Sequence, residues 1–182
     1  MIENQGEPRF IARYRDKDRK PQCLWRHLKS VSDQAGKFGQ NVGLEKTCRL
    51  IGLAHDIGKN TDEFRDYLKH ATGLIEELSF QVKGSKLDHA TAGAQILYEA
   101  FLSHDGKTTF LADILAMTVA AHHGFMDALT PDGKDALANR LSKNESATRK
   151  LQALSSLPPD ITQSVKELFD SGVDEELRNF LI

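Results

Sequence analysis

The sequence predicts an all-α fold, and two observations support that prediction. Apolar residues recur at helical spacing along most of the chain, and no segment sustains the alternation of apolar and polar residues that is typical of a half-buried strand. The chain has 182 residues, of which 40% are hydrophobic and 27% are charged, so it is long enough to bury one core and short for two independent ones. We therefore expect a single helical domain that spans residues 1–182.

The bulk composition excludes several classes of protein. No apolar run approaches the roughly 20 residues that span a bilayer, and the N-terminus lacks the basic-then-apolar pattern of a signal peptide. The two cysteines form no CxxC pair, which excludes a zinc-finger framework and favours a reducing compartment. The formal net charge of -2 argues against a protein that coats nucleic acid nonspecifically. We therefore expect a cytoplasmic protein with no membrane partner.

Helical segments are predicted from apolar spacing and from residues that begin or end helices. A charged stretch at 13–21 is expected to be a loop or a short extended arm that leads into the first helix. Thr61 and Asp88 are expected to begin helices, because their side-chain oxygens can accept a hydrogen bond from a free backbone N–H. The predicted helices are 24–39, 44–57, 61–71, 88–101 and 110–122, followed by peripheral helices that Pro131 and Pro158–Pro159 interrupt.

The chain has seven histidines, and most of them stand where apolar helices are predicted to start or stop. Burying several imidazoles is costly unless each has a suitable partner, so a shared metal centre is the favoured interpretation. His70 and His104 fall in polar stretches and are interpreted as surface residues. The candidate metal ligands are His27, His55, Asp56, His89, His122 and His123.

The dipeptide His55-Asp56 places a nitrogen ligand next to a carboxylate near a predicted helix end. The two side chains are roughly 100° apart around the helix axis, so one metal cluster beside the helix can receive both. A carboxylate has two oxygens and can bridge two ions, whereas an imidazole gives one nitrogen to one ion. Asp56 is therefore the expected bridge. Taken alone, the dipeptide occurs by chance in many chains, and a lone His27 would more often be a hydrogen-bonded core residue.

Four motifs follow one another along the chain. The first is His27 in the first predicted helix, and the others are the segments 53–59, 88–94 and 120–124, the last of which carries the double histidine. This order resembles the HD nuclease of type I CRISPR systems, a branch of the HD superfamily of metal-dependent phosphohydrolases. The resemblance covers residues 10–125. It implies an all-α HD-domain helical bundle with the metal site among the central helices, and an enzyme that cuts DNA, chiefly single-stranded, in antiviral defence. It also implies two partners, a CRISPR helicase domain or subunit and, through it, the surveillance complex.

The resemblance implies a role for each matching residue. One ion takes His27, His55 and Asp56, and a second ion takes Asp56, His89, His122 and His123. Lys59 is placed near the scissile phosphate as an electrostatic helper in catalysis, although a solvent-facing lysine beyond a helix end fits the sequence equally well. A histidine-rich shell favours Mn, Fe, Co or Ni, with Mg as the alternative. Because the pattern contains no cysteine or serine nucleophile, water is the expected attacking group.

One departure from the family pattern concerns a late aspartate that follows the double histidine and completes the shell of the first ion. No aspartate in a small, apolar helical context follows Gly124. Asp170 and Asp174 are interpreted as surface or capping residues, and residues 179–182 as the apolar beginning of a core helix. We therefore expect a chain that is truncated at its C-terminus or normally joined to a helicase, with the first ion either weakly bound or absent.

Three functions remain open at this stage: a nuclease that acts on single-stranded DNA, an HD phosphohydrolase that acts on small nucleotides, and a catalytically degenerate HD docking module.

The basic residues within 13–20 are interpreted either as a DNA contact or as a solvated loop. Trp25 is interpreted as a core residue rather than a base-stacking one. The small residues of 90–94 are expected to let two helices approach closely.

Overall fold

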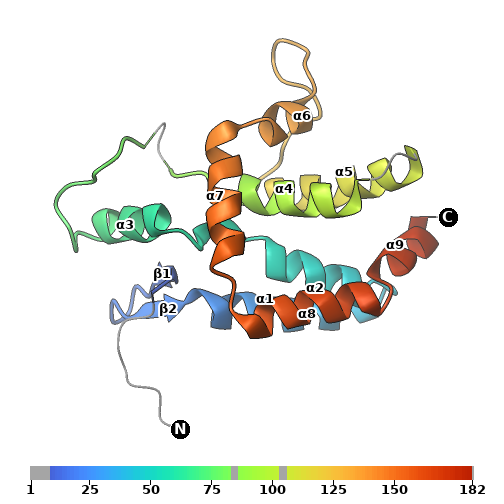
Figure 1. Cartoon of the computed structure of the whole chain (residues 1–182), viewed down its shortest axis with the longest axis horizontal. Helices are drawn as coiled ribbons and strands as arrows, with labels where there is room; N and C mark the ends of the chain where they lie inside the picture. The colour runs from blue at the N-terminus through green and yellow to red at the C-terminus, as the bar shows by residue number, and fades with distance from the viewer. Residues whose placement is uncertain (1–8, 83–85, 103–105, 182) are drawn as a thin grey trace, which may run out of the picture.

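The computed structural model describes residues 9–82, 86–102 and 106–181, and it is a helical bundle with one small sheet (Figure 1). The all-α class predicted from the sequence is confirmed for this part of the chain. Its elements are β1 (Ile11–Tyr14), β2 (Pro21–Cys23), α1 (Leu24–Gln40), α2 (Glu45–Ala54), the 3-10 helix η1 (Ile57–Lys59), α3 (Asp62–Ala71), α4 (Ala90–Phe101), α5 (Gly106–Ala120), α6 (Ala136–Leu141), α7 (Asn144–Ser155), α8 (Pro159–Asp170) and α9 (Val173–Leu181).

Residues 15–20 of the charged stretch form the loop that was expected, but this loop joins the two strands of an antiparallel hairpin, to which residues 13, 14 and 21 belong. Tyr14 pairs with Pro21, and Ile11 pairs with Cys23 and is fully buried. The two strands have four and three residues, so each is too short to show the alternation by which strands are recognised in a sequence. The hairpin fixes the start of α1, because the backbone N–H of Leu24 donates to the carbonyl just before β1.

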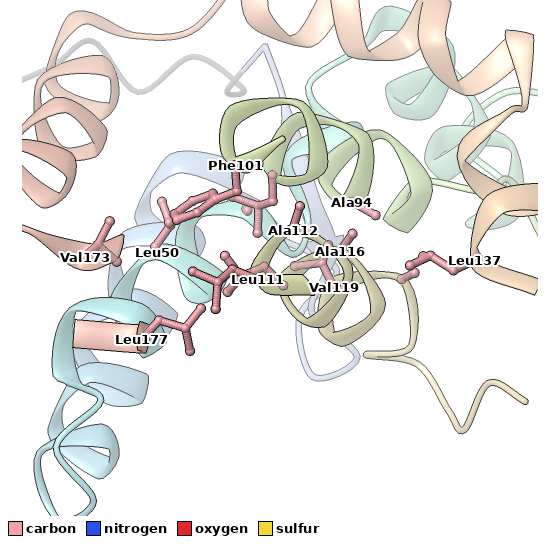
Figure 2. Packing of buried hydrophobic residues seen from close by; sticks show 14 residues of the cluster. Leu50, Ala94, Phe101, Leu111, Ala112, Ala116, Val119, Leu137, Val173 and Leu177 are labelled. Carbon is pink, nitrogen blue, oxygen red and sulfur yellow. The ribbon is translucent and has the colours of Figure 1, made fainter. Parts of the chain in front are cut away.

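The helices form two layers, with α1, α2 and α8 in one layer, α4 and α5 in the other, and α7 crossing between them (Figure 1). Helix α2 contributes to two hydrophobic clusters. Leu50 and Ala54 belong to the cluster that α4 and α5 dominate (Figure 2), whereas Leu53 packs into a second cluster with residues of β1, α1 and α8. A fully buried leucine stabilises a fold by about 1.5–3 kcal/mol, so the buried side of α2 is strongly held by both clusters. The segment that follows α2 therefore leaves the helix from a fixed position.

Glycines permit close contact between the two layers. A Cβ added at Gly93 of α4 would lie 2.2 Å from the carbonyl oxygen of Ala54, and one added at Gly58 would lie 2.1 Å from that of His89. Both neighbours are backbone atoms, which cannot rotate out of the way. The interpretation of the small residues in 90–94 as a close helix contact is therefore confirmed.

The predicted helix beginning at Thr61 is confirmed, whereas α4 begins at Ala90, two residues after Asp88. The Thr61 hydroxyl accepts a hydrogen bond from the backbone N–H of Phe64, and the Asp88 carboxylate accepts one from the N–H of Thr91. The prediction of a helix over 110–122 is wrong at both ends, because α5 begins at residue 106 and ends at residue 120. The chain then turns, with the N–H of His122 bonded to the carbonyl three residues before it.

Helix α9 caps the N-terminus of α2, although it lies far along the chain. The carboxylate of Glu176 accepts hydrogen bonds from the backbone N–H groups of Lys46 at 3.0 Å and Thr47 at 2.7 Å, and from the hydroxyl of Thr47 at 2.8 Å. Phe180 and Leu181, which were expected to begin a core helix, are instead 53% and 40% exposed in the last turn of α9.

None of the described helices has both the length and the apolar character needed to cross a bilayer.

We expect the substitution Gly93→Ala to lower the free energy of unfolding by at least about 1 kcal/mol, because overpacking against backbone outweighs the gain of about 1 kcal/mol in helix propensity. Urea denaturation of the metal-free protein measures this. Gly124→Ala is the control, since an added methyl group there meets nothing within 4 Å. Equal stability of the two variants would show that the contact between α4 and α2 is not close.

Candidate metal centre

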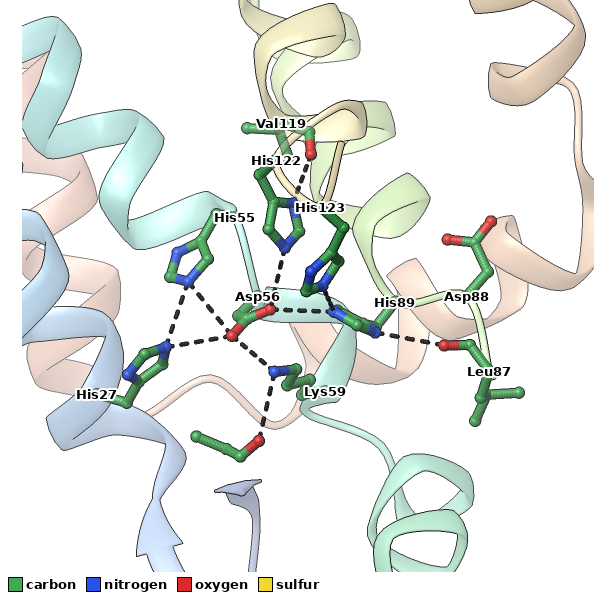
Figure 3. Close-up of polar contacts among 12 residues, drawn as sticks. His27, His55, Asp56, Lys59, Leu87, Asp88, His89, Val119, His122 and His123 are labelled. Carbon is green, nitrogen blue, oxygen red and sulfur yellow. Dashed lines mark hydrogen bonds and ion pairs between the residues drawn. The ribbon is translucent and has the colours of Figure 1, made fainter. Parts of the chain in front are cut away.

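All the candidate ligands predicted from the sequence converge on one place between the two helical layers (Figure 3). They come from four parts of the chain that are far apart in sequence. His27 lies in the first turn of α1, His55 and Asp56 follow α2, His89 precedes α4, and His122 and His123 follow α5. The end of α2, the start of α4 and the end of α5 therefore meet where the side chains are needed.

The carboxylate of Asp56 lies at the middle of this cluster, and 5% of its side chain is exposed. Its Oδ2 atom lies 3.2 Å from Nε2 of His27 and 3.3 Å from Nε2 of His55. Its Oδ1 atom lies 3.2 Å from Nε2 of His89 and 3.5 Å from Nε2 of His122. The two oxygens thus face different sets of histidines.

The potential ligand atoms form two groups that share Asp56. The first ligand group is His27, His55 and Asp56, and the second ligand group is Asp56, His89, His122 and His123. Within each group the ligand atoms lie within 4.8 Å of one another. Among the residues that the structure describes, no other His, Cys, Asp or Glu joins either group. These are the same two sets that the motif resemblance implies for two ions.

Three of the imidazoles are oriented by backbone carbonyls. Nδ1 of His55 lies 2.9 Å from the carbonyl oxygen of residue 52, Nδ1 of His122 lies 2.7 Å from that of residue 119, and Nδ1 of His89 lies 3.3 Å from that of residue 87. A carbonyl can only accept, so each Nδ1 donates to it, and Nε2 is the ring atom that faces Asp56 and is placed to bind a metal ion. For His55 and His122 the acceptor lies in the last turn of the preceding helix.

The residues of the cluster fit divalent metal ions. Oδ1 of Asp56 and Nε2 of His122 are buried and form no hydrogen bond. Leaving such an atom unsatisfied costs about 1–3 kcal/mol, and native structures contain few of them. Nε2 of His89 also lies 2.7 Å from Nε2 of His123, a close approach of two nitrogens that a shared cation would stabilise. Imidazole nitrogens around a bridging carboxylate form a donor set suited to first-row transition metals.

Asp56 and His123 have, at neutral pH, the protonation states that a metal site requires. Burial alone would raise the pKa of Asp56, but the surrounding imidazoles of His122, His27, His55 and His89 outweigh it and hold the pKa well below its usual range. Burial, together with the neighbouring His122 and His89, lowers the pKa of His123 to about 4. Asp56 is therefore ionised and His123 neutral near pH 7, so binding a metal displaces no proton from either group.

Lys59 is directed into the cluster rather than toward solvent. Its side chain is 12% exposed, and its ammonium group lies 2.8 Å from Oδ2 of Asp56 and 3.3 Å from the carbonyl oxygen of Ala12. The solvent-facing interpretation left open by the sequence is therefore wrong. The lysine supplies a fixed positive charge beside the first ligand group.

Asp88 supports the position of His89, and the sequence indicated it only as a capping residue. Its carboxylate accepts hydrogen bonds from the N–H and hydroxyl of Thr91, and it pairs with Lys143 at 3.1 Å. Burial raises the pKa of Asp88, but the contacts with Thr91 and Lys143 outweigh it and lower the pKa to about 2. The residue that precedes His89 is therefore fixed from two directions.

Helix α7 supplies further support that the sequence did not indicate. Arg149 pairs with Glu63 of α3 at 2.7 Å and donates to the carbonyl oxygen of Asp88 at 3.3 Å. The buried Asn60, just after η1, donates to the carbonyl oxygen of Ala153 at 2.7 Å. These contacts join the segments on both sides of the site to one helix. They connect residues more than 60 positions apart, and spacing along the sequence carries no signal for such pairs.

Several residues that the sequence analysis considered lie outside the cluster. Asp170 and Asp174 are exposed on α8 and α9, as expected, so neither completes the first ligand group. His70 is exposed, which confirms its interpretation as a surface residue. His104 lies outside the described residues.

The basic arm and Trp25 have structural contacts of their own. Arg15 forms an ion pair with Asp18 at 2.6 Å within the arm, so part of the positive charge of 13–20 is neutralised locally. The indole of Trp25 is partly buried and packs edge-on against Phe10, with ring centroids 6.4 Å apart. The interpretation of Trp25 as a core residue is confirmed.

Comparison with protein families gives one match. A family model described as "Cas3, HD domain" matches residues 18–179. The match includes all six candidate ligands and Lys59, and it extends through the C-terminal helices, well beyond the residues 10–125 covered by the motifs. None of the curated proteins matches the chain.

We expect Asp88→Asn to lower the free energy of unfolding of the metal-free protein by about 1–2 kcal/mol at pH 7. A shift from 3.8 to about 2 corresponds to about 2.4 kcal/mol, which partial solvent exposure reduces. A lowered pKa stabilises the fold above pH 3.8, and this contribution is lost as the pH falls toward 2. Urea denaturation at pH 7 and pH 3 measures the change.

The control for this experiment is Asp170→Asn, which alters an exposed carboxylate at the end of α8. It should leave the free energy of unfolding nearly unchanged at both pH values. A cost of Asp88→Asn that is the same at pH 7 and at pH 3 would contradict an ionised, partnered Asp88.

Proposed function

We propose that this chain, which belongs to the Cas3 HD-domain family, is a metal-dependent nuclease that hydrolyses phosphodiester bonds of single-stranded DNA in CRISPR antiviral defence. Family membership makes the chain an HD-type phosphohydrolase that depends on divalent metal. The substrate, the defence role and the partners are the proposed part. The partners are a CRISPR helicase domain or subunit and, through it, the surveillance complex.

One observation carries the proposal: each oxygen of the buried Asp56 carboxylate faces a different ligand group. This arrangement supports a pair of ions with Asp56 as the bridge. When bound, a pair of divalent ions supplies an activated water and neutralises charge that develops on the phosphate. The histidine content of both groups favours Mn, Fe, Co or Ni over Mg. The first ligand group offers three protein ligands against four in the second, so we expect the first ion to bind more weakly.

The side chains of the site have separate tasks in this proposal. Asp56 provides the single negative charge that the two ligand groups share. His55, His89 and His122 are held by their carbonyl contacts, so their Nε2 atoms need no reorientation on binding. Lys59 offers a largely buried ammonium group that can pair with a non-bridging oxygen of the substrate phosphate, where low exposure strengthens the interaction.

The exposure of the second ligand group favours a polymeric substrate over a small nucleotide. His123 and Gly124 are both exposed, and the space beside Gly124 is open. An open approach of this kind suits a strand that continues on either side of the scissile bond. A nucleotide hydrolase would instead enclose its substrate in a pocket with groups that recognise the base.

We expect the purified protein with Mn to cleave a linear single-stranded oligonucleotide and to leave nucleoside mono- and triphosphates intact. Gel electrophoresis of labelled DNA and chromatography of the nucleotides measure the two activities. Asp56→Ala is the control for the site, and it should abolish cleavage because both ligand groups lose their shared carboxylate.

Three outcomes would contradict the proposed function or its site. Hydrolysis of the small nucleotides alone would identify a nucleotide phosphohydrolase. Full retention of metal and of DNA cleavage by Asp56→Ala would show that the site is misassigned. Absence of all hydrolysis, with a folded chain and bound metal, would instead favour a catalytically degenerate docking module.

A further inference from the structure

The candidate ligands differ in exposure. In the first ligand group the side chains of His27 and His55 are 23% and 14% exposed, and Asp56 is 5% exposed. In the second ligand group His89 and His122 are 12% and 17% exposed, whereas His123 is exposed to solvent. A substrate phosphate can therefore approach the second ligand group from the side of His123.

Phe125 follows the exposed His123 by two residues and is itself uncovered. Its relative exposure is 110%, the highest among the exposed large hydrophobic residues. A methyl group added at the preceding Gly124 would meet no atom within 4 Å, so the chain between His123 and Phe125 is also uncovered. The ring therefore gains nothing from packing within the fold, and its whole apolar surface remains available to a ligand.

The position of Phe125 is held on both sides of the residue. The preceding turn is fixed by the hydrogen bond from the N–H of Gly124 to the carbonyl oxygen of Ala121. The following residue, Met126, packs against the core cluster of α4 and α5, and its sulfur lies 3.9 Å from a guanidinium nitrogen of Arg140. The exposed ring thus projects from an anchored segment.

The short stretch of chain between His123 and Phe125 suits a nucleic acid strand. Two peptide units separate His123 from Phe125, so their Cα atoms are at most about 7 Å apart. A nucleotide next to the scissile phosphate occupies a comparable length, so its base can reach the ring while the phosphate lies at the ions. Aromatic rings bind bases of any sequence by stacking, which contributes roughly 1–3 kcal/mol per base.

We propose that Phe125 is a stacking platform for the base next to the scissile phosphate of a single strand. The inference rests on the proposed nuclease function and adds a residue that selects single-stranded over duplex substrate, because a base within a duplex has no free face for the ring. Isolated exposed hydrophobic residues are common on protein surfaces, so exposure alone does not distinguish Phe125. What distinguishes it is its place two residues after an exposed metal-ligand candidate.

Phe38 provides a matched control. It is another exposed phenylalanine, at 73%, near the C-terminal end of α1. His27 lies 11 residues earlier on the same helix, so about 16 Å of helix separates Phe38 from the centre. Removing its ring tests the general effect of losing an exposed aromatic side chain.

The experiment measures binding of fluorescein-labelled phosphorothioate oligo(dT), which resists hydrolysis, by anisotropy in the presence of Mn. A strand of the same length with abasic sites in place of the thymidines keeps the backbone and removes the bases. We expect Phe125→Ala to weaken binding of oligo(dT) roughly 5- to 100-fold and to leave binding of the abasic strand unchanged. Phe125→Trp should retain the affinity of the parent, and Phe38→Ala should match the parent for both strands.

Unchanged oligo(dT) binding by Phe125→Ala would overturn the stacking inference, and so would an equal loss for the thymidine and abasic strands. Cleavage of an ordinary oligonucleotide by the parent protein is measured separately and tests the nuclease function itself. A parent that binds oligo(dT) through Phe125 without cleaving DNA would support the stacking inference while rejecting the nuclease. The two ideas can therefore fail independently.

Discussion

The buried carboxylate of Asp56 is the constraint on which the rest of the site depends. An ionised carboxylate that is 5% exposed would cost several kcal/mol if it had no partners. The fold surrounds it with four imidazoles, which hold its pKa low against the effect of burial, and with the ammonium group of Lys59 at 2.8 Å. The buried Oδ1 still has no hydrogen bond, and neither does the facing Nε2 of His122. The metal-free cluster is thus incomplete in hydrogen bonding, which is the property expected of a site whose remaining partners are cations.

The bundle is arranged to bring this cluster together at three helix ends. Helix α2 is held between two hydrophobic clusters, so the segment that carries His55 and Asp56 leaves it from a fixed point. Gly93 lets α4 touch the end of α2, and Gly58 lets η1 touch the backbone of His89. Arg149 of α7 then ties the residue before His89 to α3. Packing and ligand geometry are therefore set by the same contacts.

The sequence predicted the chemistry of the site better than the framework around it. Periodicity located the helices, and the unusual placement of histidines at their ends identified every residue of the two ligand groups, because metal ligation imposes strong requirements on residue type. The hairpin was missed because its strands are short, and the end of α5 was misplaced because a turn there preserves the apolar pattern. The contacts of Arg149 and Glu176 could not be predicted, since each joins residues that only the tertiary fold brings together. The orientation of Lys59 was ambiguous for the same reason.

The most direct test of the account is a crystal structure of the protein with Mn, with the ions located by anomalous scattering. Two anomalous peaks about 3.5–4 Å apart are expected, one beside each oxygen of Asp56, with the peak beside His89 and His122 at the higher occupancy. A single ion bound symmetrically by both oxygens of Asp56, or ions bound away from Asp56, would contradict the bridging carboxylate.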